Sequence, residues 1–205
     1  GRGCGQDRKD LRGYCMSLTS VDWSLIPAPA DDGKAAHLEG QPLPDVTLEA
    51  TDGPAVTLSD LSGLVVFYIY PMTGRPDRDL PDGWDQIPGA RGCTPQSCSF
   101  RDHYAELREW DVERLYGVST QSTEYQAEAA ERLHLPFPLL SDAGQALGKA
   151  LDLPGIEVEG QYLHKRLTMI AKDGVIVKTF YPVFPPDQDA ENVIAWLRKD
   201  AEERA

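Results

Sequence analysis

One continuous apolar run, residues 64–70, limits the folds open to this chain more than any other feature of the sequence. The run reads Leu-Val-Val-Phe-Tyr-Ile-Tyr and is closed by Pro71. β-Branched and aromatic residues without polar alternation are typical of a strand buried on both faces, as in the centre of an α/β sheet. The run is also far shorter than the ~20 apolar residues that cross a bilayer.

Length, charge and cysteine content exclude several classes of protein. The chain has 205 residues, which suggests one domain with extensions or at most two small ones. Its net charge of −13 argues against a protein that binds nucleic acid or an anionic membrane, because both need clustered positive charge. Four cysteines without a C-x-x-C pair do not make a disulfide-dense scaffold, a zinc ribbon or a thioredoxin-type dithiol. The first 15 residues lack the apolar core of a secretory signal, so we expect a cytoplasmic protein.

The rest of the pattern predicts a single α/β domain behind an extension. The Pro-rich segment 17–44 is typical of an extended arm. We expect an N-terminal extension over 1–42, partly non-native before Met16, and an α/β domain with a mixed sheet over 43–205. The expected elements are strands at 46–50, 56–58, 117–120 and 137–142, helices at 94–110, 122–133, 143–151 and 189–204, and a hairpin of 167–171 with 175–180 around an Asp-Gly turn.

The stretch 72–92 is rich in Gly and Pro and has no periodicity. It is longer than a typical loop, which predicts a functional or mobile segment. Its apolar residues Trp84, Ile87 and Pro88 could form a lid. The alternative is a solvated surface loop.

A cysteine stands at the predicted start of a helix. Cys93 or Thr94 lies near the N-cap, and Pro95 suits the first turn. The unpaired N–H groups and the positive end of the helix dipole favour thiolate over thiol there, so we expect a nucleophilic Cys93. The alternative is a small, inert, buried cysteine.

Cys98 lies five positions further along the same predicted helix. That spacing separates the two Cα atoms by roughly 8–9 Å, whereas a disulfide needs less than ~7 Å. A Cys93–Cys98 bond would therefore require the start of the helix to unwind, and the alternative is that Cys98 is simply buried. We expect Cys4 and Cys15 to be incidental; a terminal disulfide, or a metal pair with His37, lacks supporting ligand spacing.

Seven short motifs, in this order and spacing, carry a family resemblance: Tyr70-Pro71, Cys93-Thr94, Cys98-Ser99-Phe100-Arg101-Asp102, Gly117-Val118-Ser119-Thr120, Leu139-Leu140-Ser141-Asp142, Arg166-Leu167-Thr168 and Lys172-Asp173-Gly174-Val175-Ile176. Taken together, they resemble a peroxiredoxin of the bacterioferritin-comigratory-protein or Q-like group. The resemblance runs from about residue 43 to the C-terminus and implies a thioredoxin-like fold and a thiol peroxidase. It implies that Cys93 would be the peroxidatic cysteine and Cys98 the resolving one.

The resemblance also assigns an arginine and its partners. Arg166 occupies the place of the family's late-strand arginine, and its fixed charge would stabilise the Cys93 thiolate and hold the peroxide oxygens. Gln96 stands where relatives usually carry an acidic residue that orients this arginine. Backbone N–H groups near Gly92 would complete the substrate site.

Two family positions depart from the pattern. Gln86 and Ala90 stand where relatives place a proline and a hydroxyl before the peroxidatic cysteine. Because the loop before Cys93 is longer than in relatives, we assign the role of the family's proline to Pro71, which ends the apolar run. For the hydroxyl we nominate Thr73, with Thr94 as the alternative.

The resemblance therefore predicts the reduction of hydrogen peroxide or organic hydroperoxides through a Cys93 sulfenic acid. A Cys93–Cys98 disulfide would follow, and thioredoxin or a glutaredoxin-like dithiol would reduce it. It implies no metal or organic cofactor and a monomer or weak dimer. The alternatives are a non-enzymatic redox sensor and a disulfide oxidoreductase on the same fold, although the second usually needs C-x-x-C.

Overall fold

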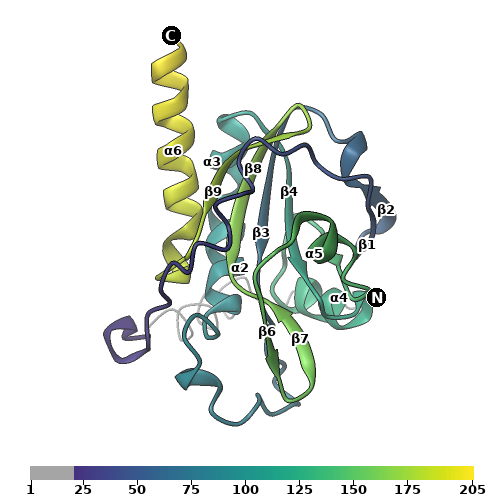
Figure 1. Cartoon of the computed structure of the whole chain (residues 1–205), viewed down its shortest axis with the longest axis vertical. Helices are drawn as coiled ribbons and strands as arrows, with labels where there is room; N and C mark the ends of the chain where they lie inside the picture. The colour runs from purple at the N-terminus through teal and green to yellow at the C-terminus, as the bar shows by residue number, and fades with distance from the viewer. Residues whose placement is uncertain (1–20) are drawn as a thin grey trace, which may run out of the picture.

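The computed structural model describes residues 21–205, so Cys4 and Cys15 lie outside the described residues. The main strands are β1 Thr47–Ala50, β2 Gly53–Thr57, β3 Leu64–Ile69, β4 Val112–Ser119, β5 Leu139–Ser141, β8 Leu167–Lys172 and β9 Val175–Phe180. They form one mixed sheet in the order β2-β1-β5-β4-β3-β8-β9. This sheet, flanked by helices, confirms the predicted thioredoxin-like α/β class (Figure 1).

The apolar run forms an interior strand of the sheet, buried on both faces, as predicted. β3 pairs in parallel with β4 and antiparallel with β8. Its side chains alternate between two cores, because successive residues of a strand point to opposite faces. Val65, Phe67 and Ile69 pack in the first core, and Val66 and Tyr68 pack in the second.

Helices cover both faces of the sheet (Figure 1). The second core is closed by α2 Cys93–Asp102, α3 Tyr104–Glu109 and α6 Asp189–Arg204. The first core is closed by α5 Ala146–Leu151 and by the segment that precedes β1. The remaining helix, α4 Thr123–Arg132, packs beside β5.

The described part of the predicted extension packs on this same domain. Ala35 and Leu38 are buried in the first core. The Gly40 amide donates to the Ile176 carbonyl of β9, and the Ile176 amide donates to the Gln41 carbonyl. The division at residue 43 stays a prediction, but residues 35–41 pack as part of the α/β domain.

Two elements differ from the sequence prediction. The helix expected over 94–110 is broken at His103, whose backbone leaves the helical region and whose ring nitrogen lies 2.8 Å from the Ser99 carbonyl oxygen. A second hairpin, β6 Gly155–Val158 with β7 Gln161–His164, was missed. Its short strands follow a Pro-Gly pair that indicates a break, and positive φ angles at Glu159 and Gly160 make its turn.

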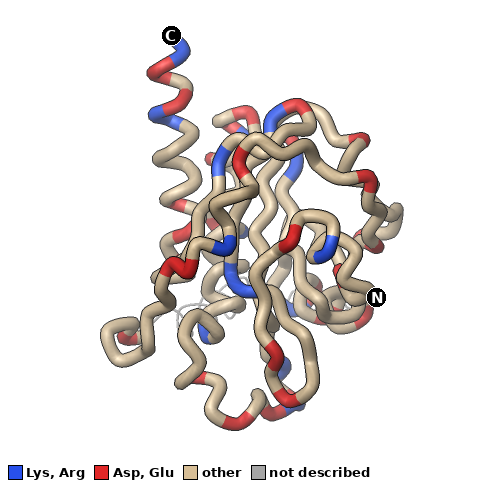
Figure 2. Tube along the Cα trace, in the orientation of Figure 1, with Lys and Arg blue, Asp and Glu red and all other residues tan. Residues whose placement is uncertain are grey.

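Charged residues are spread around the described chain, with Lys and Arg interspersed among Asp and Glu (Figure 2). No single element of the described chain collects the acidic excess, which is typical of a solvated surface. Within residues 21–205, no helix is both long and apolar enough to cross a membrane.

Candidate active site

Cys93 begins α2 directly after a strained glycine. Gly92 is the N-cap and has a left-handed φ of 115°. A Cβ at this position would lie 2.5 Å from Pro186 Cγ and 2.9 Å from Trp23 Cη2. Only glycine combines that φ with so close an approach. This geometry places the Cys93 thiol in the first turn of α2, where it is 3% exposed and free.

The Arg166 guanidinium contacts the Cys93 sulfur. Arg166 lies between β7 and β8 and is 3% exposed. Its Nη2 atom is 3.2 Å from Cys93 Sγ and also donates to the Ala90 carbonyl oxygen at 3.0 Å. The same Nη2 atom lies 3.3 Å from each of the carbonyl oxygens of Gly89 and Arg91, so three backbone carbonyls hold the guanidinium in place. The contact places the fixed positive charge of the guanidinium directly at the Cys93 sulfur.

Gln96 connects the arginine to a buried carboxylate that sequence reasoning missed. Arg166 Nη1 donates to Gln96 Oε1 at 2.5 Å, and Gln96 Nε2 donates to Asp189 Oδ2 at 2.8 Å. Thr168 Oγ1 donates to the same carboxylate oxygen at 2.5 Å. Burial raises the pKa of Asp189 to about 6. An acidic residue in the first turn of a helix is ordinary, so no signal in the sequence marked Asp189.

The structure separates the three residues nominated for the active-site hydroxyl and proline, which are Thr73, Thr94 and Pro71. Thr73 is buried, and its hydroxyl donates to Gln121 Oε1 at 3.3 Å. Thr94 instead lines the cavity of about 350 Å³ that holds Cys93. Pro71 lines a smaller cavity of about 80 Å³ behind Arg166. Thr94, and not Thr73, therefore shares a cavity with Cys93.

The chain matches a known protein family over most of its length. The family model described as Redoxin matches residues 38–194. The chain belongs to the redoxin family. It is 30% identical over 161 residues to the chloroplastic peroxiredoxin Q of Sedum lineare, covering 78% of this chain and 77% of the relative. It is 31% identical over 157 residues to the peroxiredoxin Bcp of Bacillus subtilis, covering 74% of this chain and 90% of the relative.

Solved structures agree with this assignment. The peroxidoxin BcpB of Mycobacterium tuberculosis aligns with a TM-score of 0.64 at 27% identity, covering 80% of this chain and 98% of the other. The chain is therefore a redoxin of the peroxiredoxin Q/Bcp type, which is a thiol-dependent peroxidase. The predicted cytoplasmic location stays a prediction, since the Sedum relative is named chloroplastic.

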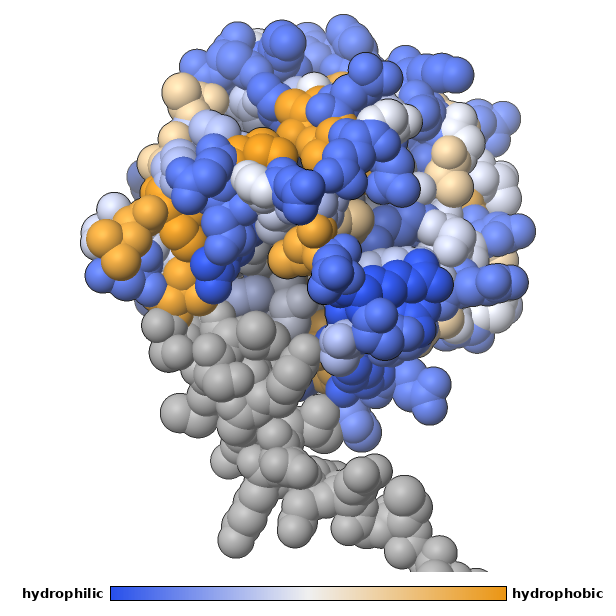
Figure 3. Space-filling view, turned by 90° about the horizontal axis from the view of Figure 1, so that it is seen from below, coloured by the Kyte–Doolittle hydropathy of each residue, from blue (hydrophilic) through white to orange (hydrophobic). Residues whose placement is uncertain are grey.

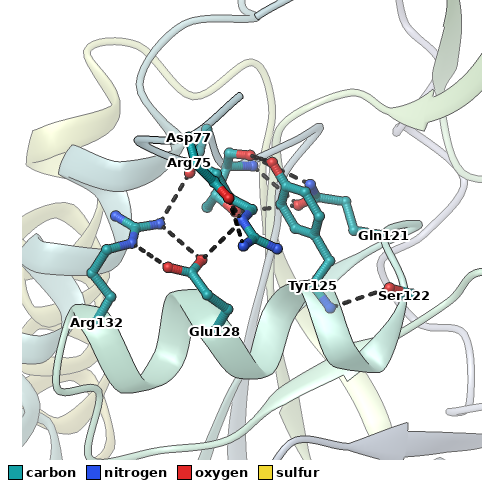
Figure 4. Close-up of polar contacts among 9 residues, drawn as sticks. Arg75, Asp77, Gln121, Ser122, Tyr125, Glu128 and Arg132 are labelled. Atoms are coloured by element: carbon teal, nitrogen blue, oxygen red, sulfur yellow. Dashed lines mark hydrogen bonds and ion pairs between the residues drawn. The ribbon is translucent and has the colours of Figure 1, made fainter. Parts of the chain in front are cut away.

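The long loop before Cys93 is anchored on α4 in this peroxiredoxin. Glu128 of α4 accepts from Arg132 Nε at 2.7 Å and lies 3.9 Å from Arg75 of the loop (Figure 4). Arg75 also pairs with Asp77 at 3.0 Å, and the Tyr125 hydroxyl donates to a loop carbonyl at 2.9 Å. These contacts hold the loop in a defined conformation.

Part of the same loop forms a wall of the redoxin site. Trp84 is 4% exposed, lines the Cys93 cavity and packs in a small core with Val158 and Leu163 of the missed hairpin. Ile87 packs against this small core and Pro88 lines the cavity behind Arg166, so the two lie against the domain. At this end of the molecule, apolar side chains gather in small groups among hydrophilic ones (Figure 3). The lid role of the loop stays a prediction.

Cys98 occupies a different environment from Cys93. It is 1% exposed and packs against Leu133 and Leu135, whereas Cys93 packs in the core that contains Tyr68. Cys93 is a free thiol and Cys98 is disulfide-bonded, so the two are not bonded to each other here. A bond between them requires movement at the start of α2.

His164 serves the fold of this peroxiredoxin. The residue is fully buried, and its Nε2 atom lies 2.7 Å from Asp142 Oδ2. Asp142 also accepts from the amides of Leu147 and Gly148 in α5. The pair therefore attaches β7 to α5. Among residues 21–205, no cluster of three His, Cys, Asp or Glu side chains suits a metal ion.

Proposed function

We propose that Cys93 is the peroxidatic cysteine of this peroxidase. The Cys93 thiolate attacks the terminal oxygen of the hydroperoxide, so an S–O bond forms and the O–O bond breaks. The leaving alkoxide or hydroxide takes up a proton, which leaves an alcohol or water and a sulfenic acid. The 3.2 Å contact between Arg166 Nη2 and Cys93 Sγ carries this proposal.

Three neighbouring groups support the reaction at Cys93. Arg166 holds positive charge where the thiolate and the peroxide oxygens meet. Gly92 gives the start of α2 no side-chain cap, so we infer that first-turn amides of α2 donate to the peroxide oxygens. Thr94 brings a hydroxyl to the cavity that contains the thiol. We propose Thr94 in place of Thr73 as the residue that contacts peroxide.

Cys98 is proposed as the resolving cysteine. Its thiol attacks the Cys93 sulfenic acid, so a disulfide forms and water leaves. A dithiol protein such as thioredoxin or a glutaredoxin then supplies two electrons by thiol–disulfide exchange. The five-residue spacing within α2 means that the first turns must unwind, since helical geometry keeps the two Cα atoms more than ~7 Å apart.

Turnover tests the role of Cys93. Purified protein should consume hydrogen peroxide or an alkyl hydroperoxide in the presence of thioredoxin, thioredoxin reductase and NADPH. Cys93→Ser should abolish this consumption. If Cys93→Ser consumed peroxide as fast as the wild type, the proposed role would fail.

Disulfide mapping tests the role of Cys98. Fully reduced protein is treated with one equivalent of peroxide, and the peptides are identified by mass spectrometry. We expect a Cys93–Cys98 disulfide, and in Cys98→Ser a Cys93 sulfenic acid that dimedone traps. A map that joins Cys93 to Cys4 or Cys15 instead would assign resolution to one of those cysteines.

A further inference from the structure

The carboxylate of Asp189 is buried and is linked to the reactive thiol through Gln96 and Arg166, yet no step of the peroxidase reaction uses it. Asp189 is the first residue of α6 and is 1% exposed. One oxygen accepts from both Gln96 and Thr168. Burying a carboxylate is costly unless donors satisfy it, so its place beside the site needs a reason.

The reason lies in the two ends of the Gln96 amide. A carboxylate only accepts hydrogen bonds and a guanidinium only donates them, whereas an amide side chain does both. With its NH₂ on Asp189, Gln96 must turn its oxygen toward Arg166. The reversed amide would place NH₂ against the guanidinium and oxygen against the carboxylate, which satisfies neither partner.

We propose that Asp189 is a positioning residue for the peroxide-reacting site. It fixes the orientation of Gln96, and Gln96 in turn fixes the Arg166 guanidinium against the Cys93 sulfur. The hydrogen-bond acceptor that orients this network comes from α6, because position 96 carries an amide in place of a carboxylate. The inference rests on the proposed role of Cys93.

The alternative is that Asp189 only joins α6 to β8 through Thr168. The two roles differ in what restores activity. If Asp189 acts through Gln96, an acceptor placed at either residue 189 or residue 96 should keep Arg166 in place. If it only joins the helix to the sheet, a carboxylate at residue 96 should restore nothing.

Four variants separate these roles: Asp189→Ala, Asp189→Asn, the double variant Gln96→Glu with Asp189→Ala, and the matched control Glu191→Gln. Glu191 stands in the same first turn of α6, and its side chain is 63% exposed. Two rates are measured on each reduced variant near neutral pH: the second-order rate constant for oxidation of Cys93 by hydrogen peroxide, and the rate at which iodoacetamide alkylates Cys93. Both are followed on the Cys93 peptide by mass spectrometry.

Asp189→Ala should slow both rates by about tenfold or more, the size expected when a hydrogen bond to a charged group is lost. Asp189→Asn keeps an acceptor and should stay within about threefold of wild type, as should the double variant, which returns the acceptor to residue 96. Glu191→Gln should match wild type. Wild-type rates in Asp189→Ala, or a double variant as slow as Asp189→Ala, would overturn the inference.

Two further results keep the test decisive. If Asp189→Ala does not fold, Gln96→Leu breaks the same link from the other end and should give the same loss, whereas wild-type rates would again overturn the inference. If peroxide does not oxidise Cys93 in the wild type while alkylation follows the expected order, the peroxidatic role fails and the positioning role stands.

Discussion

The buried carboxylate of Asp189 predicts a pH dependence of stability with a definite sign. Burial raises the pKa of Asp189 from 3.8 to about 6, against the opposing effects of Thr168, Gln96 and Arg166. The folded protein then binds this proton more tightly than the unfolded chain does. The stability from this group is therefore complete below about pH 4 and is lost as the pH rises through about 6.

The size of the stability change follows from how far the pKa of Asp189 is raised. A rise of about two pKa units, at ~1.4 kcal/mol per unit, changes the free energy of unfolding by ~3 kcal/mol over the whole titration of Asp189. About 1.4 kcal/mol of this should be lost between pH 5 and pH 8. The groups that face Asp189 from the packed elements are Arg166, Gln96 and Thr168, together with Tyr68 of β3, whose own pKa is raised mainly by burial and only to a lesser extent by this carboxylate.

Asp189→Asn isolates this contribution, because the amide does not titrate. Urea unfolding of reduced wild type and Asp189→Asn at pH 5 and pH 8 gives the difference in free energy of unfolding at each pH. The variant should gain about 1.4 kcal/mol relative to wild type between the two pH values. Glu191→Gln should show a much smaller change, because the Glu191 side chain is 63% exposed and is not buried among the partners of Asp189. A difference between wild type and Asp189→Asn that does not change with pH, or that falls, would refute the reasoning.

Three further substitutions test other parts of the structure. Gly92→Ala should lower the free energy of unfolding by more than ~1 kcal/mol in a urea titration, because it strains a left-handed backbone and drives Cβ into Pro186. Glu128→Gln removes the ion pair with Arg75 of the 72–92 loop, so limited proteolysis within that loop should become faster; unchanged proteolysis would show that this ion pair does not anchor the loop. Asp142→Ala leaves a buried imidazole and two amides without their acceptor, so it should cost about 3 kcal/mol of unfolding free energy; a loss below about 1 kcal/mol would contradict this structural role.

The fold was largely predictable from the sequence because its strongest signals are local. The apolar run made β3 an interior strand, and the Asp-Gly turn fixed the β8–β9 hairpin. The final helix was predicted with its observed bounds, 189–204. The β6–β7 hairpin was missed because its short strands gain stability from Trp84, a contact distant in sequence.

The site was predictable only in part. Cys93, Arg166 and Gln96 meet as the family resemblance implied. Asp189 was missed because a carboxylate that begins a helix is usually exposed, and only tertiary packing buries this one. Thr73 was nominated for the active-site hydroxyl because the usual position holds Ala90 and the loop is lengthened, yet its hydroxyl donates to Gln121.

The central claim is that the Arg166 charge makes Cys93 the thiol that reacts with peroxide, and one rate tests it most directly. Reduced wild type and Arg166→Gln are mixed with hydrogen peroxide, and the second-order rate constant for oxidation of the Cys93 peptide is measured. Loss of the fixed charge at 3.2 Å should slow this step by roughly 100-fold or more, the size found when one charge-stabilising donor is removed from an active site. Oxidation of Cys93 at the wild-type rate in a folded Arg166→Gln protein would contradict the account.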